Sequence, residues 1–166
     1  ESMARQFLYG QRFARAEFGI DMDVLWLPDA FGYSYALPQI ARAAGIRYFV
    51  TSKLSWSQFN RFPYDTFTWR GADGSELLSH FITTPELENP GGTSHTYNGQ
   101  ITPRELNGIW ENYRQKDIND ELLMLFGWGD GGGGPTREML DRAGALRNLP
   151  GIPSVKLGKA EPYFDR

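Results

Sequence analysis

The sequence lacks cysteine, holds two histidines and has no long apolar run in its 166 residues. Without cysteine, neither a disulfide nor a zinc site with thiolate ligands can form, and a reducing compartment is allowed. No apolar run approaches the length that crosses a bilayer, and no signal-peptide pattern opens the chain. The net charge is −3 and the basic residues form no stripe, so we expect neither a membrane partner nor a nucleic-acid partner.

Composition is typical of a globular protein. Hydrophobic residues make up 40% of the chain and aromatic residues 14%. A chain of this length is sufficient for a single domain, residues 1–166, with a buried core. The sequence opens in a helical pattern without an initiating methionine and ends where another helix begins, at residues 162–166. We therefore expect a piece of a longer protein.

The first third of the chain alternates between helix and strand patterns. Apolar residues recur near a 3.6-residue period over residues 2–18, and Gly19 is suited to the position after a helix. Residues 24–27 and 46–51 are predicted strands, and residues 35–44 are a predicted helix between them. This order predicts an α/β fold with a parallel sheet and outer helices.

The middle of the chain predicts an inserted β-hairpin followed by a long loop. Residues 67–70 and 76–82 are rich in β-forming residues and flank Asp73-Gly74, which is a strong turn signal. Residues 83–101 contain few apolar side chains, and a loop of that length in a compact domain is usually functional or mobile.

Helix and strand patterns alternate again toward the end of the chain. Thr102, Pro103 and Glu105 predict a helix that begins with a capping box and extends to about residue 116. The remaining predicted elements are a strand at 122–126, a helix that ends near residue 147, and a last strand at 154–157.

Asp29 follows the first predicted strand. Pro28 ends that strand because proline cannot donate to a sheet ladder, so Asp29 lies on a loop between a strand and a helix. Catalytic groups collect on such loops in barrel-type α/β proteins. Aspartate is also a favoured N-cap, so an equally acceptable interpretation is that Asp29 caps the next helix.

A glycine tract at residues 127–136 carries Asp130. Its G-x-G-x-x-G spacing formally matches the dinucleotide fingerprint, but Asp130 would face the pyrophosphate. A phosphate-binding P-loop is excluded because Pro135 replaces the required lysine. The remaining interpretations are a flexible loop and a place where a ligand approaches the backbone closely. In the second case Asp130 is a candidate acid.

Asp29 and Asp130 both follow predicted strands. In a parallel α/β arrangement, the two loops open on the same face of the sheet. A pair of carboxylates on one face is what glycoside hydrolysis requires, one as nucleophile or base and the other as proton donor. Many proteins carry aspartate on such loops, so the pattern alone only suggests this chemistry.

The sequence resembles glycoside hydrolase family 38, the retaining, zinc-dependent α-mannosidases. The resemblance covers nearly the whole chain, and its motifs lie at residues 26–40, 53–60, 67–75, 97–99 and 127–136. It implies that the chain is the central part of the catalytic domain, which is a parallel (β/α) barrel of seven strands in the family.

The resemblance also implies the roles of three charged residues. Asp29 matches the family's nucleophile, which is also a zinc ligand. Lys53 matches a basic residue that touches the nucleophile, and an ammonium there would favour the ionised carboxylate. Asp130 matches the general acid/base. Without the resemblance, Lys53 could equally be a solvated lysine at a strand end.

Three aromatic residues are candidates for contact with the substrate. Tyr97 lies where the family has a tyrosine that contacts the sugar. Trp56 and Trp128 could stack on a sugar face, although a buried core position is the commoner fate of tryptophan.

Zinc is the cofactor that the resemblance implies. The family holds it with a His-x-Asp pair upstream of the nucleophile and with a later His-Asp motif, and neither occurs here. Because zinc needs about four donors, Asp29 alone leaves the site incomplete, and we expect no tight zinc binding by this chain. The histidines are His80 and His95, and we expect His80 to be a hydrogen-bonding residue.

The parent protein is therefore expected to hydrolyse terminal α-linked mannose through a covalent glycosyl-enzyme, as a cytoplasmic enzyme of bacterial type. This chain alone is expected to be inactive and to self-associate through open strand edges. The alternative is a non-catalytic sugar- or nucleotide-binding α/β module, which would not need both Asp29 and Asp130.

Overall fold

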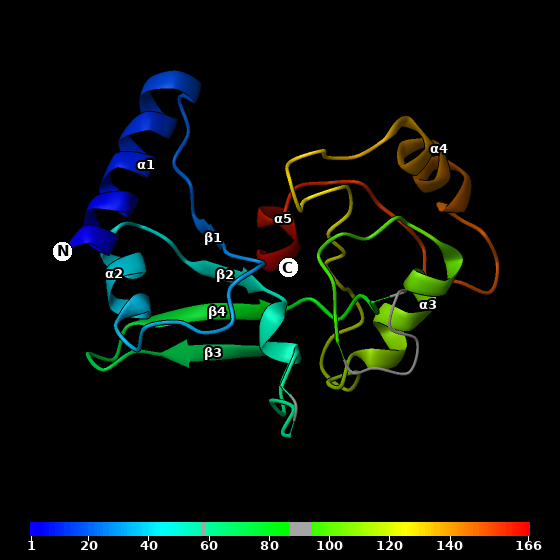
Figure 1. The fold of residues 1–166 in the computed structure, drawn as a ribbon, viewed down its shortest axis with the longest axis horizontal. Helices are drawn as coiled ribbons and strands as arrows, with labels where there is room; N and C mark the ends of the chain where they lie inside the picture. The colour runs from blue at the N-terminus through cyan, green and yellow to red at the C-terminus, as the bar shows by residue number, and fades with distance from the viewer. Residues whose placement is uncertain (58, 87–93) are drawn as a thin grey trace.

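The computed structural model describes residues 1–57, 59–86 and 94–166. Its elements are α1 (Ser2–Phe18), β1 (Val24–Trp26), α2 (Leu37–Ala43), β2 (Tyr48–Thr51), the 3₁₀ turn η1 (Lys53–Ser55), β3 (Thr66–Arg70), β4 (Glu76–Phe81), α3 (Pro103–Asn112), α4 (Arg137–Leu146) and α5 (Glu161–Phe164) (Figure 1). Gln58 of the family-like stretch and residues 87–93 of the expected long loop lie outside this description.

A four-stranded sheet in the order β1-β2-β4-β3 organises the fold. β1 pairs with β2 and β2 with β4 in parallel, whereas β3 pairs with β4 as an antiparallel hairpin. The predicted α/β class, parallel pairing and hairpin are confirmed. The parallel strands point toward the part of the molecule that holds α3 and α4 (Figure 1). The seven-stranded barrel stays a prediction, because the described residues form this one sheet.

The hairpin turn follows from its sequence. Gly71 N–H donates to the Ser75 carbonyl at 2.8 Å, and Gly74 adopts a φ of +85°, which favours glycine. The Asp73 carboxylate accepts from the backbone N–H of Ser75 at 3.0 Å and from its hydroxyl at 2.7 Å. These contacts set the register that aligns β3 with β4.

β2 is buried along its whole length because both faces of the sheet are covered. On one face, Phe49 packs with Leu77 and Phe81 in a core cluster under α2. On the other face, Tyr48 stacks on Phe164 of α5 with ring centroids 4.7 Å apart. A central parallel strand needs apolar side chains on both of its faces. This packing holds β2 in place, and with it the strand end after which η1 begins.

The helix ends match the sequence signals. Gly19 follows α1 in the left-handed conformation, and Thr102 and Glu105 form the predicted capping box of α3. The Glu105 carboxylate also accepts from the Gln100 N–H at 3.0 and 3.1 Å. This carboxylate therefore holds the segment before α3, where Ile101 has a φ of +55°.

Two predicted strands and the predicted end of α3 are wrong, and some other boundaries shift by one or two residues: β2 begins at Tyr48 rather than at residue 46, and α2 spans Leu37–Ala43 rather than residues 35–44. Residues 122–126 and 154–157 form no strand, since a strand needs a continuous ladder partner. Residues 122–126 have only an isolated bridge between Gly99 and Phe126. α3 ends at Asn112, before the predicted residue 116, because Tyr113 adopts an extended conformation.

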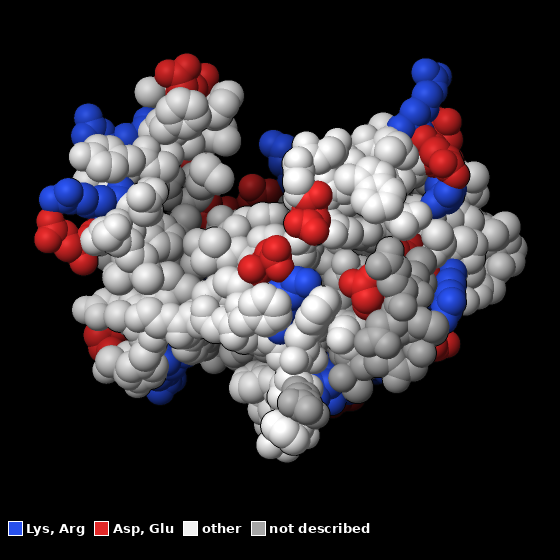
Figure 2. All heavy atoms as spheres, viewed as in Figure 1, with Lys and Arg blue, Asp and Glu red and all other residues white. Residues whose placement is uncertain are grey.

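The surface carries charges of both signs. On the face drawn in Figure 2, basic and acidic side chains of the described residues are dispersed among uncharged ones. In the part of the chain that the structure describes, no helix has the length and hydropathy needed to cross a membrane. β1 and β3 are the outer strands of the sheet, and self-association through them stays a prediction.

Candidate active site

Asp29 lies just beyond β1, on the loop that leads to α2. Leu27 N–H donates to the Val50 carbonyl at 3.1 Å, which continues the pairing of β1 with β2. The Pro28 carbonyl accepts from the backbone N–H of Ser52 at 3.3 Å and from its hydroxyl at 2.7 Å. These bonds fix the loop against the end of β2 and leave the Asp29 side chain 48% exposed.

Asp29 does not cap the helix that follows it. The N-cap position of α2 is Ala36, which makes no side-chain cap bond. The capping interpretation of Asp29 is therefore wrong, and its carboxylate is available for other contacts.

Lys53 comes to Asp29 because β1 and β2 are parallel neighbours. It begins η1, two residues after β2 ends at Thr51. Its Nζ lies 3.6 Å from Asp29 Oδ1, and its side chain is 13% exposed. This low exposure does not fit a solvated lysine at a strand end. The ammonium and the carboxylate therefore form an ion pair at this distance.

Tyr97 contacts the second oxygen of the Asp29 carboxylate. Its hydroxyl donates to Asp29 Oδ2 at 2.8 Å. Removal from water raises the pKa of Tyr97 to about 12, and the Asp29 hydrogen bond and the negative charges of Asp29 and Asp130 act in the same direction. The phenol therefore stays a neutral donor through the physiological pH range.

The segment that carries Tyr97 is held by backbone contacts at its base. Thr96 N–H donates to the Thr84 carbonyl at 2.9 Å, and Pro85 and His95 form an antiparallel bridge. These contacts tie the segment to the residues that follow β4. Tyr97 thereby starts from the same end of the sheet as Asp29 and Lys53.

The glycine tract forms a closed turn, in contrast to a dinucleotide-binding turn. Trp128 N–H donates to the Gly134 carbonyl at 2.8 Å, and Gly134 N–H donates back to the Trp128 carbonyl at 2.7 Å. α4 begins at Arg137, so in the fully described stretch 127–137 no helix directly follows the last glycine of the fingerprint. The formal dinucleotide match has no structural counterpart.

Gly129 sets the position of Asp130. Its N–H donates to Asn98 Oδ1 at 2.7 Å. A β-carbon on Gly129 would lie 2.9 Å from that oxygen and 3.0 Å from Cε2 of the Tyr97 ring, so a larger residue would force the two segments apart. Asp130 is exposed, and its charge raises the pKa of Tyr97. The tract therefore brings the second carboxylate to the Tyr97 side of Asp29.

Both candidate indoles are partly exposed, Trp56 by 41% and Trp128 by 49%. Neither is a buried core residue, so that alternative interpretation is wrong. Trp56 Nε1–H donates to the His95 carbonyl at 2.8 Å, whereas Trp128 is held through its backbone bonds to Gly134.

A cavity of about 340 Å³ opens next to Pro28, the residue before Asp29. Pro28, Tyr97, Gly127 and Gly129 are among the residues that line it. Part of the wall therefore comes from the start of the Asp29 loop, the Tyr97 segment and the glycine tract, and most of the rest comes from residues 123–126, 158 and 160.

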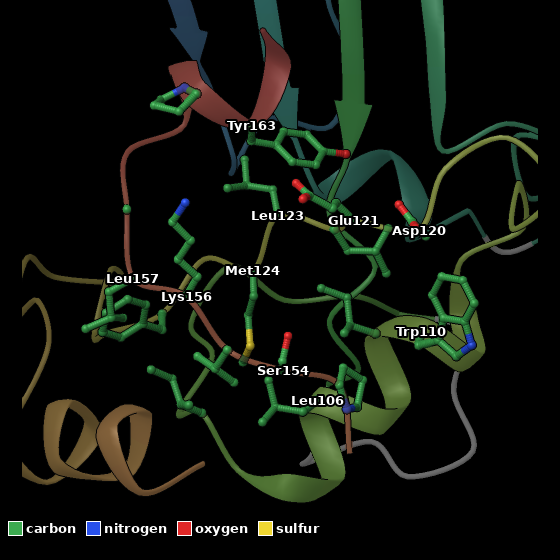
Figure 3. Close-up of a pocket in the computed structure, with 18 of the residues that line it drawn as sticks. Leu106, Trp110, Asp120, Glu121, Leu123, Met124, Ser154, Lys156, Leu157 and Tyr163 are labelled. Atoms are coloured by element: carbon green, nitrogen blue, oxygen red, sulfur yellow. The ribbon is translucent and has the colours of Figure 1, made fainter. Parts of the chain in front are cut away.

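A larger cavity of about 710 Å³ lies between α3 and the C-terminal segment (Figure 3). Its walls are mainly apolar, with Leu106, Met124 and Leu157 among them. Asp29, Lys53, Tyr97 and Asp130 are not among its lining residues. Tyr97 lines the smaller cavity, whereas Asp29, Lys53 and Asp130 line neither of the two.

The two histidines are buried rather than exposed to a ligand. His80 Nδ1 lies 2.9 Å from the Thr66 hydroxyl and 3.1 Å from the Tyr163 hydroxyl, so the expected hydrogen-bonding role is confirmed. Burial lowers the pKa of His80 to about 3. Burial also lowers the pKa of His95 to about 3, and the charges of Arg61 and Arg114 act in the same direction.

The donor set does not form a zinc site. Among residues 1–57, 59–86 and 94–166, no group of three or more histidine, cysteine, aspartate or glutamate side chains could hold a metal ion. Asp29 offers one carboxylate, and zinc needs about four donors. The described residues of this chain therefore do not fit zinc on their own.

Two residues of the site were missed by the sequence reasoning. Phe31 faces Trp56, with ring centroids 6.1 Å apart, and Asn98 binds the glycine tract through Gly129. Both lie inside the family-like stretches 26–40 and 97–99, so their positions in those stretches were the available signal.

Comparison with known proteins gives a consistent result. The model of the glycosyl hydrolases family 38 N-terminal domain matches residues 1–166. The chain is 44% identical to alpha-mannosidase G of Dictyostelium discoideum over 166 residues, 46% identical to human alpha-mannosidase 2C1 over 164, and 41% identical to an alpha-mannosidase of Saccharomyces cerevisiae over 171. Each alignment covers 99% of this chain but only 14–15% of the relative.

A solved structure shows a similar fold. The crystal structure of an alpha-mannosidase from Enterococcus faecalis V583 matches 98% of this chain and 18% of that chain, with a TM-score of 0.61 and 15% identity. At this identity the similarity concerns the fold alone. The chain thus spans 14–18% of the length of these proteins.

Proposed function

Because this chain belongs to glycosyl hydrolase family 38, within the N-terminal domain of that family, we propose that the protein containing it is an α-mannosidase that hydrolyses terminal α-linked mannose. The observation that carries the proposal is the Asp29 carboxylate held between the Lys53 ammonium at 3.6 Å and the Tyr97 hydroxyl at 2.8 Å. A nucleophilic carboxylate must be oriented toward its substrate, and these two contacts fix the orientation of Asp29.

The proposed reaction retains the configuration of the sugar. Asp29 attacks the anomeric carbon and forms a glycosyl-enzyme bond, while the bond from that carbon to the leaving oxygen breaks. Asp130 gives its proton to the leaving oxygen. Asp130 then takes a proton from water, which attacks the anomeric carbon and releases mannose and the Asp29 carboxylate.

Tyr97 and Trp128 are the proposed contacts to the sugar. Tyr97 and the glycine tract line the cavity of about 340 Å³ next to Pro28, and the partial exposure of Trp128 leaves its indole accessible. The glycine backbone around Asp130 would let a sugar approach that carboxylate closely.

We propose zinc as a cofactor of the whole protein, with the Asp29 carboxylate as one ligand. Zinc would supply electrostatic stabilisation of the sugar hydroxyls. The described residues do not complete such a site, so the other donors would lie elsewhere in the whole protein. A whole protein that contains no zinc and keeps its activity after chelation would contradict this part of the proposal.

The proposal is tested by turnover of an aryl α-mannoside by the whole protein. Proton NMR of the first sugar released should show the α-anomer, and mass spectrometry of trapped enzyme should place a hexosyl adduct on Asp29. Release of the β-anomer first would contradict the retaining course. Binding of mannose or a nucleotide without any cleavage would favour the non-catalytic module.

A further inference from the structure

The Lys53 ammonium lies among three aromatic rings. Nζ is 3.5 Å from the centre of the Trp56 ring, 5.5 Å from that of Tyr97 and 5.8 Å from that of Phe31. All three distances are within the range at which a ring face attracts a cation, and tryptophan attracts most strongly. We call Trp56, Tyr97 and Phe31 the aromatic enclosure of Lys53.

Trp56 is the ring of the enclosure closest to the ammonium, and its position is fixed. Its indole N–H donates to the His95 carbonyl at 2.8 Å. The His95 N–H donates in turn to the Ser55 hydroxyl at 3.1 Å, which ties the same two segments together. Phe31 meets the indole edge to face at an interplanar angle of 76°. The indole therefore offers a preorganised face to Lys53.

The ion pair of Lys53 with Asp29 would be weak without the aromatic enclosure. Lysine has a long flexible stem, and a pair with a half-exposed carboxylate loses much of its attraction to side-chain entropy and solvent. Asp29 is 48% exposed, whereas Lys53 is 13% exposed. The Lys53 side chain is less exposed than that of Asp29 because the three rings cover it. The rings also restrict the positions that the ammonium can adopt.

We propose that Trp56 is a positioning residue, whose indole face holds the Lys53 ammonium against the Asp29 carboxylate. The inference rests on the proposed function. It gives Trp56 a different task from sugar stacking, because Lys53 already occupies one face of the ring. The effect of Trp56 on the reaction then passes through Lys53.

A double-mutant cycle on the whole protein tests this dependence. The variants are Trp56→Leu, Lys53→Met and the double variant, assayed on an aryl α-mannoside with a good leaving group. Trp56→Leu should lower kcat by about 3- to 30-fold, the range that a cation–π contact supports. In the Lys53→Met background, the same change should lower kcat by less than about twofold. Equal losses in both backgrounds, or a rise in KM alone, would overturn the proposal.

Two further variants separate positioning from general damage. Trp56→Phe keeps a ring face for Lys53 and should retain most of the activity, so a loss equal to that of Trp56→Leu counts against the inference. Trp110→Leu is the matched control, since Lys116 Nζ lies 5.5 Å from that indole in α3, and it should keep kcat within about twofold of wild type.

A measurement that does not depend on turnover keeps the inference separate from the proposed function. Acetylation of Lys53 by acetic anhydride, followed by peptide mass spectrometry, should be about 3- to 30-fold faster in Trp56→Leu than in wild type, because the ammonium loses its enclosure. An unchanged acetylation rate would overturn the inference even in an active enzyme. Faster acetylation in a protein that cleaves no mannoside would uphold the contact and remove only the proposed activity.

Discussion

Tyr97 donates a hydrogen bond of 2.8 Å to the carboxylate of Asp29, although 68 residues separate them in the chain. The contact joins the loop after β1 to the segment that returns from β4. It depends on the parallel order β1-β2-β4, which brings the ends of these strands to one side of the sheet. The candidate site is thus a direct product of the sheet topology.

The first prediction concerns the Tyr97 hydroxyl. Tyr97→Phe removes the donor to Asp29 and keeps the ring, and a hydrogen bond to a charged group contributes about 1.5–3 kcal/mol. We expect kcat of the whole protein on an aryl α-mannoside to fall by about 10- to 100-fold. The control is Tyr35→Phe, because Tyr35 is exposed on the loop before α2, and its activity should stay near wild type.

The same variant tests the ionisation of the phenol. The pKa of Tyr97 is raised to about 12, so its hydroxyl stays protonated well above pH 10 and donates at every pH of an ordinary assay. The ratio of wild-type to Tyr97→Phe activity should therefore be constant between pH 6 and pH 9. A ratio that declines across this range would show that the phenol ionises early.

The second prediction concerns Asp29 itself. Asp29→Asn keeps the shape of the side chain but removes the nucleophilic oxygen charge, and loss of a nucleophile lowers kcat by on the order of 10³-fold or more. Steady-state turnover of an aryl α-mannoside measures this loss. The matched control is Asp141→Asn on α4, an exposed carboxylate, which should stay within about twofold of wild type. An Asp29→Asn enzyme with wild-type kcat would remove Asp29 from the mechanism.

Local signals in the sequence were sufficient to predict most of the regular elements. The capping box of Thr102 and Glu105, Gly19 after α1 and the Asp73-Gly74 turn each act within a few residues, so a single sequence shows them. Residues 122–126 are as apolar as a strand, but a strand also needs a partner ladder. Their backbone has one isolated bridge, which no local pattern reports.

The candidate residues were predictable to a different degree. Asp29 and Asp130 follow apolar runs, and the family-like motifs singled out Lys53 and Tyr97. The contacts among them depend on β1 and β2 being parallel neighbours and on the close approach of Gly129 to Asn98. The cation–π contact of Trp56 with Lys53 depends on the conformation of η1, which the sequence pattern does not specify.

The third prediction concerns the close approach of the glycine tract. Gly129→Ala would place a β-carbon 2.9 Å from Asn98 Oδ1 and 3.0 Å from the Tyr97 ring. The Asn98 side chain, the Tyr97 ring or the tract must then shift. Because Tyr97 contacts Asp29, such a shift misplaces groups at the site, and a displacement of about 1 Å at reacting groups lowers rates by about 10²-fold. We expect a loss of that order in kcat, measured on the whole protein.

Gly144→Ala is the control for this substitution. Gly144 lies within α4 and an added β-carbon meets nothing within 4 Å, so alanine there should stabilise the helix by about 0.5–1 kcal/mol. Its kcat should match wild type. A Gly129→Ala enzyme that is as active as Gly144→Ala would show that the approach of the two segments is not needed for the reaction.

The last prediction concerns the buried His80 and the pH dependence of stability. The pKa of His80 is lowered from 6.5 to about 3 by burial, so between these values the unfolded chain binds a proton that the folded chain does not. Acidification therefore favours unfolding, and the free energy of unfolding should fall by about 1.4 kcal/mol per pH unit for this histidine once the pH is well below 6.5. Urea unfolding of the 166-residue chain at several pH values between 7.5 and 5 measures the slope.

The variant His80→Asn isolates the contribution of this histidine. Its amide oxygen can accept from the Thr66 hydroxyl, which lies 2.9 Å from His80 Nδ1, and the side chain does not titrate. The slope of His80→Asn should thus be smaller than that of wild type by about one proton, with His95 supplying what remains, because its pKa is also lowered to about 3. Equal slopes in the two proteins would mean that His80 binds its proton in the folded chain as readily as in the unfolded one.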